Sequence, residues 1–440
     1  MKKINNKENV KVLFTILNVI VYSMLFMFIF ICFYKDIKLS LSRNIIMAFI
    51  YLVILVIFGK LFDAFDLGET RVYDLFLSYS LTTFIVNFIT YFILCLISLE
   101  FVSIWQFIIL EIIDVAFAAF VLLKENQFIR DNYPIPKAVA IVGKNNSDIL
   151  KKIHKYRDIL VTVDKTLNLK EININELSIL LKGYERVITV DVDYNNKKKI
   201  LKTCYENHIE VLDIPSITDM LIASSNIMHV IDTPILKINR FGPSMIESFV
   251  KRLIDILGSL FLIILTSPIM LVVAIAIKIN DGGTILFKQK RLTKDEKVFN
   301  IYKFRSMIMD AELFTGVVLA KENDVRITKV GKFIRKTRFD ELPQLFNILK
   351  GDMTFVGPRP ERPEIYQQIL KSIPEFKYRL TVKAGLTGYA QIYGKYNTTL
   401  KDKLLLDIYY IENYKLIDDV KLLLQTLKVI FKPDSTEGVK

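Results

Sequence analysis

The chain has 440 residues, of which 52% are hydrophobic, and its mean hydropathy is positive. This composition is too apolar for an ordinary soluble enzyme, and it predicts a membrane protein with room for two or three domains. Lys and Arg (59) outnumber Asp and Glu (46), and nearly all of the net charge of +13 falls in residues 237–440. A basic domain suits nucleic acid, anionic lipid or phosphorylated substrates. Because no nucleic-acid-binding motif is present, we expect lipid phosphate and nucleotide as partners.

The few cysteines and histidines exclude several kinds of site. The three cysteines, Cys32, Cys95 and Cys204, are scattered, so neither a disulfide framework nor a zinc site is expected. The chain has only three histidines, and none lies near the acidic pair at 340–341. A histidine base is therefore not expected at that pair.

Four apolar stretches in residues 1–130 predict a bundle of four transmembrane helices. They cover 12–34, 44–59, 75–99 and about 103–123. The first is uncharged over its whole length and is long enough to cross a bilayer at ~1.5 Å per residue. Glu111 and Asp114 interrupt the fourth, and we expect them in an interior or interfacial position. Basic residues before the first and after the fourth stretch favour cytoplasmic ends, which an even number of spans allows.

Residues 136–235 have the alternating pattern of a small doubly wound α/β domain. Strands are predicted at 138–142, 159–163, 186–192 and 209–214, with helices at 146–156 and 195–207. Gly143 ends the first strand, but Lys144, Asn145 and Asn146 stand where a dinucleotide fingerprint needs glycines. We therefore expect a degraded Rossmann-like domain with a structural or regulatory role, which binds no cofactor.

A second kind of apolar segment follows at 246–280. It is uncharged from Ile256 to Ile277, which would measure ~33 Å as a straight helix. Ser267 and Pro268 lie at its midpoint, where a proline removes a backbone hydrogen bond and kinks the helix. Basic residues on both flanks favour a return to the same membrane face. From these residues alone, a kinked spanning helix and a re-entrant helix both remain open.

Residues 281–440 predict a basic, mixed α/β domain on the membrane surface. A strand and loop at 284–305 lead to Lys303 and Arg305, and the segments 363–372 and 399–432 are predicted to be helical.

The centre of this domain is an acidic pair, Asp340 and Glu341. Apolar residues follow the pair at helical spacing, at Leu342, Leu345, Phe346 and Leu349. They predict an amphipathic helix over 340–350, with Pro343 in its first turn and Gly351 as its stop. The pair would then lie at the helix N-terminus, where the helix dipole favours carboxylates and other anions.

Arginines flank the acidic pair on both sides. Arg335, Lys336 and Arg338 precede it, and Arg359 follows in a Gly-Pro-Arg-Pro turn. Two acids among guanidinium groups suit phosphate chemistry, because arginines bind phosphate oxygens in a forked geometry. Composition alone also permits a solvated helix start with acidic capping residues.

The order of the motifs identifies a resemblance. Asp-Glu-Leu-Pro-Gln at 340–344 is followed by Gly-Asp-Met-Thr at 351–354 and Val-Gly-Pro-Arg-Pro at 356–360. Together with Tyr-Lys-Phe-Arg-Ser-Met at 302–307 and Gly-Leu-Thr-Gly-Tyr-Ala-Gln at 385–391, this closely resembles the bacterial sugar transferases over about 246–432. These are phosphoglycosyl transferases with a monotopic-type catalytic domain. The four-span bundle with a nucleotide-fold insert is similar to their large polytopic members.

The resemblance implies roles for named residues. Asp340 would be the nucleophile and a ligand of a required Mg²⁺, with Glu341 as its partner. Arg335 and Arg359 match the phosphate-contacting arginines of the family. Lys303 and Arg305 are further candidates. Each could bind the nucleotide or pair with a structural acid.

The resemblance also implies a reaction and a location. A sugar 1-phosphate would pass from a UDP-sugar to undecaprenyl (polyprenyl) phosphate through a covalent aspartyl intermediate, which starts exopolysaccharide, capsule or O-antigen synthesis. The protein would be a multi-pass protein of the bacterial inner membrane, with a re-entrant helix broken at Ser267–Pro268 and a cytoplasmic catalytic domain. The sugar, the pathway and a homo-oligomeric state stay open. The alternatives are a non-catalytic scaffold for polysaccharide assembly and a membrane oxidoreductase that uses the middle domain.

Two departures from the family pattern stand close to the motifs. Lys294, Asp295, Glu296 and Lys297 replace the usual glycines, and Arg338 replaces a usual small polar residue before the acidic pair. Neither removes a catalytic group, but both could change the preference for the donor.

Overall fold

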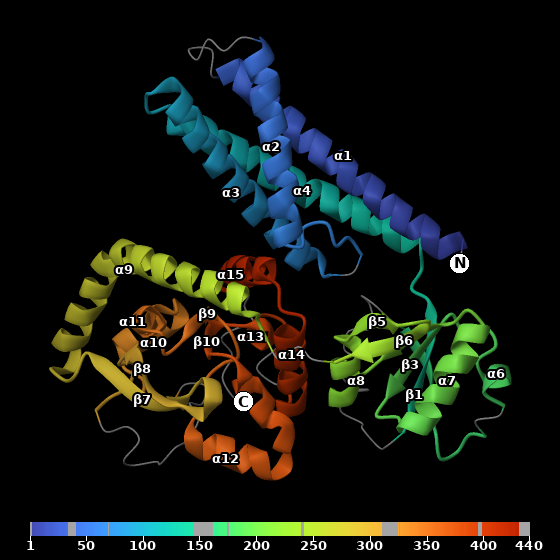
Figure 1. Ribbon diagram of the computed structural model, residues 1–440. Coiled ribbons are helices and arrows are strands. Elements are labelled where there is room, and N and C mark those ends of the chain that lie inside the picture. Colours follow the sequence, from blue (N-terminus) through green and yellow to red (C-terminus); the bar gives the residue numbers. More distant parts are fainter. Residues whose placement is uncertain are drawn as a thin grey trace. The chain divides into compact units, whose positions relative to one another are not determined.

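The computed structural model describes residues 2–33, 41–68, 70–143, 162–173, 176–238, 242–309, 324, 326–394 and 398–430. It divides into two compact units, Met1–Pro215 and Ser216–Lys440. The first unit holds a bundle of long helices and a parallel sheet (Figure 1). The second unit holds a long bent helix and a mixed domain of short helices and strands (Figure 1).

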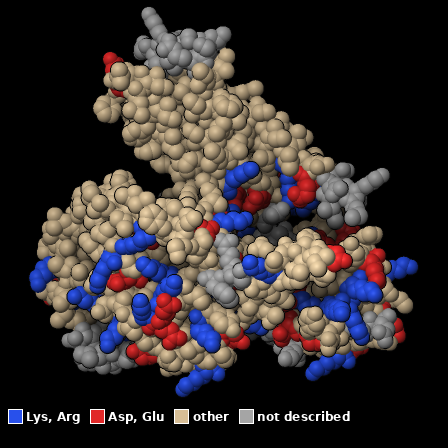
Figure 2. All heavy atoms as spheres, viewed as in Figure 1, with Lys and Arg blue, Asp and Glu red and all other residues tan. Residues whose placement is uncertain are grey.

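The predicted apolar stretches of residues 1–130 each lie in one long helix. These helices are α1 (Lys2–Phe33), α2 (Leu41–Leu61), α3 (Val72–Ser98) and α4 (Ile104–Asn132). Each helix packs against two of the others around an apolar core. The described part of the chain contains five helices that are long and apolar enough to cross a membrane, namely these four and α9 (Met245–Asp281). On the face seen in Figure 2, the middle of the four-helix bundle carries almost no charged side chains.

Polar groups lie inside this bundle and bond to one another. The amide of Asn87 donates hydrogen bonds of 2.9 Å to Glu111 Oε2 and 2.9 Å to Asp114 Oδ2. The hydroxyl of Tyr51 donates to Asn87 Oδ1 at 3.0 Å. Asp114 is fully buried inside the bundle, whereas Glu111 is partly exposed. Such groups need internal partners in an apolar environment, which supplies none.

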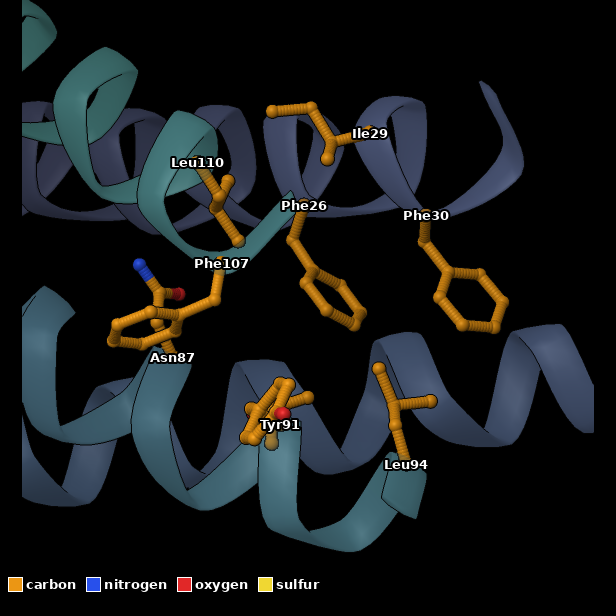
Figure 3. Close-up of a pocket in the computed structure, with 9 residues that line it drawn as sticks. Phe26, Ile29, Phe30, Asn87, Tyr91, Leu94, Phe107 and Leu110 are labelled. Atoms are coloured by element: carbon orange, nitrogen blue, oxygen red, sulfur yellow. The ribbon is translucent and has the colours of Figure 1, made fainter. Parts of the chain in front are cut away.

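A small cavity lies beside this polar cluster, between α1, α3 and α4 (Figure 3). It has room for about one water molecule. Asn87 borders it, and the rings of Phe26, Phe30, Tyr91 and Phe107 surround it (Figure 3). The bundle core is therefore closed mainly by aromatic packing.

The middle domain is a four-stranded parallel sheet in the order β2-β1-β3-β4. Its elements are β1 (Lys137–Val142), β2 (Thr162–Asn168), α6 (Leu177–Leu180), β3 (Arg186–Val190), α7 (Tyr194–Glu206) and β4 (Glu210–Asp213). The predicted alternation is confirmed for β1, β3, α7 and β4, whereas β2 runs on to Asn168, beyond the strand expected at 159–163, and α6 was not predicted. The helix expected at 146–156 and the start of the strand expected at 159–163 lie outside the described residues.

Gly143 has a structural explanation in this sheet. Its N–H donates to Val190 O at 3.0 Å. A Cβ at this position would lie 2.2 Å from Asp191 O, far inside contact distance. Close packing beside β3 therefore requires a glycine here, whether or not a nucleotide binds.

The second unit begins earlier than the composition suggests. Its first elements are α8 (Ile217–Ala223), β5 (Asn226–Val230) and β6 (Thr233–Lys237). We expected this segment within the middle domain, but Ile217, Met220 and Leu221 pack against the apolar cluster around Tyr366 and Leu404. Contacts distant in the sequence place α8 with the C-terminal domain.

The C-terminal domain combines an antiparallel hairpin, a short parallel pair of strands and several helices. Its elements are β7 (Leu286–Leu292), β8 (Val298–Phe304), α10 (Lys329–Lys336), α11 (Gln344–Lys350), β9 (Thr354–Val356), α12 (Pro363–Ser372), β10 (Gly385–Thr387), α13 (Tyr389–Ile392), α14 (Leu400–Glu412) and α15 (Leu416–Ile430). The helix predicted at 363–372 is α12. The stretch predicted as helical at 399–432 is two helices, because the chain turns at 413–415, where Tyr414 is buried.

The hairpin turn explains the usual glycines of the family. Asp295 (φ 57°) and Glu296 (φ 56°) both have left-handed backbone conformations in the turn between β7 and β8. Glycine adopts this conformation without steric cost, whereas other residues are strained there. This chain keeps the turn but fills it with charged side chains.

The long helix α9 (Met245–Asp281) contains Pro268 and bends partway along its length (Figure 1). A capping box of Ser244 and Glu247 begins it, and Gly282 (φ 70°) ends it. Residues on both sides of Pro268 pack against the same domain. Leu262 and Ile263 join the cluster around Ile348, and Val273 and Ile277 join the cluster around Phe304 and Ile334.

Polar contacts fix the first arm of α9 to the domain. The Arg252 guanidinium donates to Ile348 O (2.7 Å) and Leu349 O (2.8 Å), at the C-terminal end of α11. The buried carboxylate of Asp255 accepts a hydrogen bond from the backbone N–H of Phe355 in β9 at 3.0 Å. Lys251 pairs with Asp419 of α15. The first arm of α9 is therefore part of the domain core.

Replacing Asp255 by Leu is expected to weaken this anchorage. The substitution leaves the buried N–H of Phe355 without an acceptor, which costs about 1–3 kcal/mol. Thermal unfolding of the purified protein in detergent should show a lower midpoint than wild type. The matched control is Glu364→Gln, an exposed acid in the first turn of α12 that should leave the midpoint unchanged. Equal midpoints for both variants would contradict the anchoring role.

Candidate active site

The acidic pair lies in a 3₁₀ turn, Phe339–Glu341, immediately before α11. The expectation of one helix over 340–350 is therefore wrong in its start, because α11 begins at Gln344 and Pro343 is its N-cap. Pro343 has no N–H to donate to the preceding turn, so the 3₁₀ turn and the α-helix are separate. Gly351 (φ 96°) ends the helix as predicted.

The apolar face of α11 also differs from the predicted one. Leu345 and Ile348 are buried, whereas Phe346 is 44% exposed. The helix begins later than expected, and its buried face includes the polar residues Gln344 and Asn347. The expected core position of Phe346 is therefore wrong.

Asn347 joins α11 to the strand that carries Lys303. Its side chain accepts from the backbone N–H of Tyr302 at 2.9 Å and donates to Asn300 O at 2.8 Å. It is fully buried and takes the place of a neighbouring strand beside β8. The position of β8 relative to the acidic turn is fixed by these bonds. Helical spacing of apolar residues gives no signal for such a residue.

Glu341 is held between two cations. Lys303 Nζ lies 2.9 Å from Glu341 Oε1, and the guanidinium of Arg359 lies 3.6 Å from the same oxygen. Burial alone would raise the pKa of Glu341, but these two cations hold the pKa of its carboxyl well below its usual range. Glu341 is therefore ionised at any working pH.

Asp340 has a different environment. Burial raises its pKa, and the adjacent negative charge of Glu341 raises it further. Three cations, Lys303, Arg335 and Arg338, limit this rise, and the pKa of Asp340 comes to about 6. Within the described residues, no side chain donates a hydrogen bond to the Asp340 carboxylate. Its oxygens are ionised at neutral pH and available to a ligand.

The structure brings together most of the predicted site residues. Arg335 lies in the last turn of α10 and acts on Asp340 through its charge. A small polar pocket is lined by Arg291, Ile301, Lys303, Gln344, Arg359, Pro360 and Gly385. Sequence reasoning did not single out Arg291, because only the fold brings β7 beside the loop of Arg359. Arg338 was noted as a flanking residue, but its charge also acts on both acids.

Arg305 lies in another environment. It follows the end of β8 and forms an ion pair with Asp281 at the end of α9. This is the structural-acid alternative that we left open for Lys303 and Arg305. The two residues therefore differ, since Lys303 contacts Glu341. Ser267 and Pro268 are inside α9, where the Ser267 hydroxyl donates to Ile264 O at 2.8 Å.

The site offers one available carboxylate for a metal ion. The described residues include no cluster of three His, Cys, Asp or Glu side chains that could hold a metal by themselves. Mg²⁺, however, is commonly bound through one or two carboxylates together with substrate phosphates and water. Asp340 fits this pattern, whereas Glu341 is already paired with Lys303 and Arg359.

Known proteins resemble the C-terminal part of the chain. The family model for bacterial sugar transferases matches residues 246–433, which include all of the site residues. Over 239 residues the chain is 41% identical to the UDP-N-acetylgalactosamine-undecaprenyl-phosphate N-acetylgalactosaminephosphotransferase of Aeromonas hydrophila. Over 235 residues it is 36% identical to the UDP-glucose:undecaprenyl-phosphate glucose-1-phosphate transferase of Klebsiella pneumoniae.

The coverage of these matches differs. The Aeromonas match covers 53% of this chain and 55% of that protein, and the Klebsiella match covers 52% and 50%. The chain thus spans about half the length of these two relatives. The exopolysaccharide production protein PSS of Rhizobium leguminosarum bv. phaseoli is 36% identical over 188 residues, which is 40% of this chain but 92% of that protein. The motifs, the fold of the site and this nearly complete match agree, and the chain belongs to the bacterial sugar transferase family.

Proposed function

We propose that this protein transfers a sugar 1-phosphate from a UDP-sugar to undecaprenyl phosphate, and so starts the synthesis of a polysaccharide. The proposal rests on the different surroundings of the two acids, Asp340 and Glu341. Glu341 is fixed by Lys303 and Arg359, whereas the ionised carboxylate of Asp340 has no hydrogen-bond partner among the described residues. Two acids with separated pKa values are typical of sites in which each has its own role. The names of the relatives support the choice of donor and acceptor.

The reaction we infer has two steps. In the first, an oxygen of Asp340 attacks the sugar-bearing phosphorus, and the bond from that phosphorus to the bridging oxygen breaks, so that UMP leaves with the bridging oxygen. In the second, a phosphate oxygen of undecaprenyl phosphate attacks the same phosphorus and the bond to Asp340 breaks. The products are undecaprenyl diphosphate sugar and the restored carboxylate. Division into two steps lets one site receive a soluble donor first and a lipid acceptor afterwards.

The cations around the acids meet the electrostatic demand of this attack. A carboxylate that approaches a diphosphate is repelled by its charge, so phosphate oxygens need compensation in a site that is already formed. Arg359 is half exposed, and Arg335 is partly exposed, so both can reach a ligand. Glu341 orients Lys303 and Arg359 and lowers the cost of holding them together without substrate.

We infer that Mg²⁺ assists this site. Asp340 would hold it together with the donor phosphates, since the described residues supply no complete ligand set of their own. When bound, Mg²⁺ neutralises phosphate charge and so favours attack by an anion.

The proposed topology places the catalytic domain on the cytoplasmic face of the inner membrane. Four helices would cross the bilayer, and α9 would enter and return to the same face. Both arms of α9 pack against one domain, and a proline lies between them, which supports a re-entrant course. A straight crossing would separate Val273 and Ile277 from Phe304, at the cost of their packing.

A covalent intermediate on Asp340 is the decisive expectation. Wild type with UDP-sugar and Mg²⁺, without lipid, should release UMP up to one equivalent and gain the mass of a sugar phosphate on the Asp340 peptide. Asp340→Asn keeps the shape but removes the attacking charge, so turnover should fall by roughly three or more orders of magnitude. Glu341→Gln should also be severely impaired, because Lys303 and Arg359 lose their shared partner. A panel of UDP-sugars in the same assay identifies the sugar.

Three outcomes of this assay would contradict the proposal. If no UDP-sugar yields UMP, the scaffold and oxidoreductase alternatives are favoured. If Asp340→Asn transfers at the wild-type rate, the acidic pair is structural. If UMP appears only with lipid present and rapid quenching traps no adduct, transfer is direct. A matched control is Glu364→Gln, an exposed acid of α12 that should leave UMP release close to wild type.

The pH dependence should report the ionisation of Asp340. The pKa of about 6 predicts that UMP release falls as the pH drops through 6, because the protonated acid cannot attack. Since the charge of Lys303 lowers this pKa, Lys303→Met should shift the acidic limb to higher pH. Lys350→Met, at the exposed end of α11, should leave the limb in place. The role of Asp340 as the attacking group would be ruled out if UMP release in wild type fell only near pH 4. It would also be ruled out if the acidic limb lay at the same pH in Lys303→Met and Lys350→Met.

Cysteine labelling in intact cells should test the topology. In a variant without the native cysteines, Met245→Cys and Asp295→Cys place exposed thiols before and after α9. A reagent that cannot cross the membrane should modify neither. Phe101→Cys, between α3 and α4, is 96% exposed at the native side chain and should be modified as the external control. Modification of just one of the two thiols around α9 would show that α9 crosses the membrane.

A further inference from the structure

The loop that carries Arg359 is held through its backbone. Four consecutive carbonyl groups, from Pro358 to Glu361, each accept a hydrogen bond. The donors in order are Gly385 N (2.9 Å), Arg379 Nη2 (3.0 Å), Arg291 Nη1 (3.0 Å) and Leu292 N (2.9 Å). The loop itself supplies few donors of its own, because Pro358 and Pro360 have no N–H. Its conformation therefore depends on groups from β7, β10 and the segment before β10.

Of the two side-chain donors, Arg379 is the more deeply buried. Its Nε and Nη2 bind Asp407 Oδ2 at 3.0 Å and 2.8 Å, and the side chains are 5% and 2% exposed. The guanidinium also lies over the ring of Phe376, 4.6 Å from the centroid. Its remaining donor, Nη1, lies 3.7 Å from Glu361 Oε1. Buried in this way, Arg379 is fixed in direction and does not reach a ligand.

The pair of Arg379 and Asp407 is therefore rigid, and Arg379 connects it to Arg359, the arginine that is proposed to bind phosphate. A buried guanidinium that binds one carboxylate oxygen with a fork of two nitrogens has a defined orientation. That orientation directs Nη2 to the carbonyl of Arg359, whose own side chain extends to Glu341. A shift of the Arg359 backbone would move its guanidinium relative to Glu341 and to any phosphate bound there.

We propose that Arg379, held by Asp407, is a positioning residue that sets the direction of Arg359 for phosphate binding. The inference rests on the proposed function, because it assigns Arg379 a role in that reaction. It goes beyond a structural ion pair, because the guanidinium also donates to the backbone of the residue that is proposed to bind phosphate. Misplacement of a binding group by about 1 Å can reduce a rate ~100-fold.

An apolar replacement of the pair separates positioning from stability. In Arg379→Met combined with Asp407→Leu, no buried charge is left without a partner, and such replacements are often neutral or stabilising. We expect a folded protein with kcat/KM for UMP release reduced ~10- to 100-fold, mainly in kcat. The same replacement in an Arg359→Ala background should change the rate less than about twofold, because the group being positioned is absent.

The controls keep the two proposals distinguishable. The double replacement Arg186→Met with Glu210→Leu removes a forked pair of the middle domain and should leave the rate at the wild-type value. If the apolar replacement of Arg379 and Asp407 does not fold, Arg379→Lys keeps the charge but not the fork, and should show a smaller loss with the same dependence on Arg359. Wild-type rates in either variant, or equal losses with and without Arg359, would overturn the positioning role.

Backbone exchange supplies a readout that does not depend on turnover. Amide hydrogen exchange of the peptides that contain Leu292 and Gly385, whose N–H groups donate to this loop, should accelerate in the Arg379 variants and stay at the wild-type rate in the Arg186 control. Unchanged exchange would contradict the proposal even where turnover falls. If wild type itself releases no UMP, the proposed function fails, while exchange still decides whether the pair orders the loop.

Discussion

The site depends on one buried carboxylate, that of Glu341, which lies between Lys303 and Arg359. The three residues come from a turn, a strand and a loop that are distant in the sequence. A buried charge whose partner is removed is strongly destabilising, so these segments have to assemble together or not at all. The same charge raises the pKa of the neighbouring Asp340, and the surrounding cations limit that effect. Assembly of the fold and the proposed division of roles between the acids thus have one electrostatic origin.

An ion pair and hydrogen bonds also connect the domain of this site to the apolar helix α9. Lys251, Arg252 and Asp255 follow one another on the first arm of α9, and each binds a different element of the domain. Arg252 binds the last carbonyls of α11, the helix that follows the acidic turn. The distance between the apolar helix and the acids is therefore set by direct bonds. A site that joins a soluble donor to a lipid acceptor requires a fixed distance of this kind.

The sequence predicted best what depends on neighbouring residues. The apolar stretches, α12, the strands of the middle domain and the stop at Gly351 follow from local periodicity and turn chemistry. It predicted least what depends on the fold, such as Asn347 between α11 and β8 and the forked pair under the Arg359 loop. Lys303 and Arg305 would share one face if β8 continued, but β8 ends at Phe304 and Arg305 turns to Asp281. The alternation of side chains along a strand therefore does not predict the direction of a residue that follows the end of the strand.

Arg338 shows how a departure from the family pattern changes the site. It precedes the acids with φ 60°, a left-handed conformation that costs roughly 1 kcal/mol for a residue with a Cβ. Its charge opposes the rise of the Asp340 pKa and adds to the cations that hold Glu341 ionised. A small polar residue would supply the turn without this charge. In the proposed reaction Asp340 has to stay ionised without being tied to a cation, because a carboxylate in an ion pair is a weaker nucleophile. A cation that acts through space meets both conditions, at the cost of strain in the residue next to the turn.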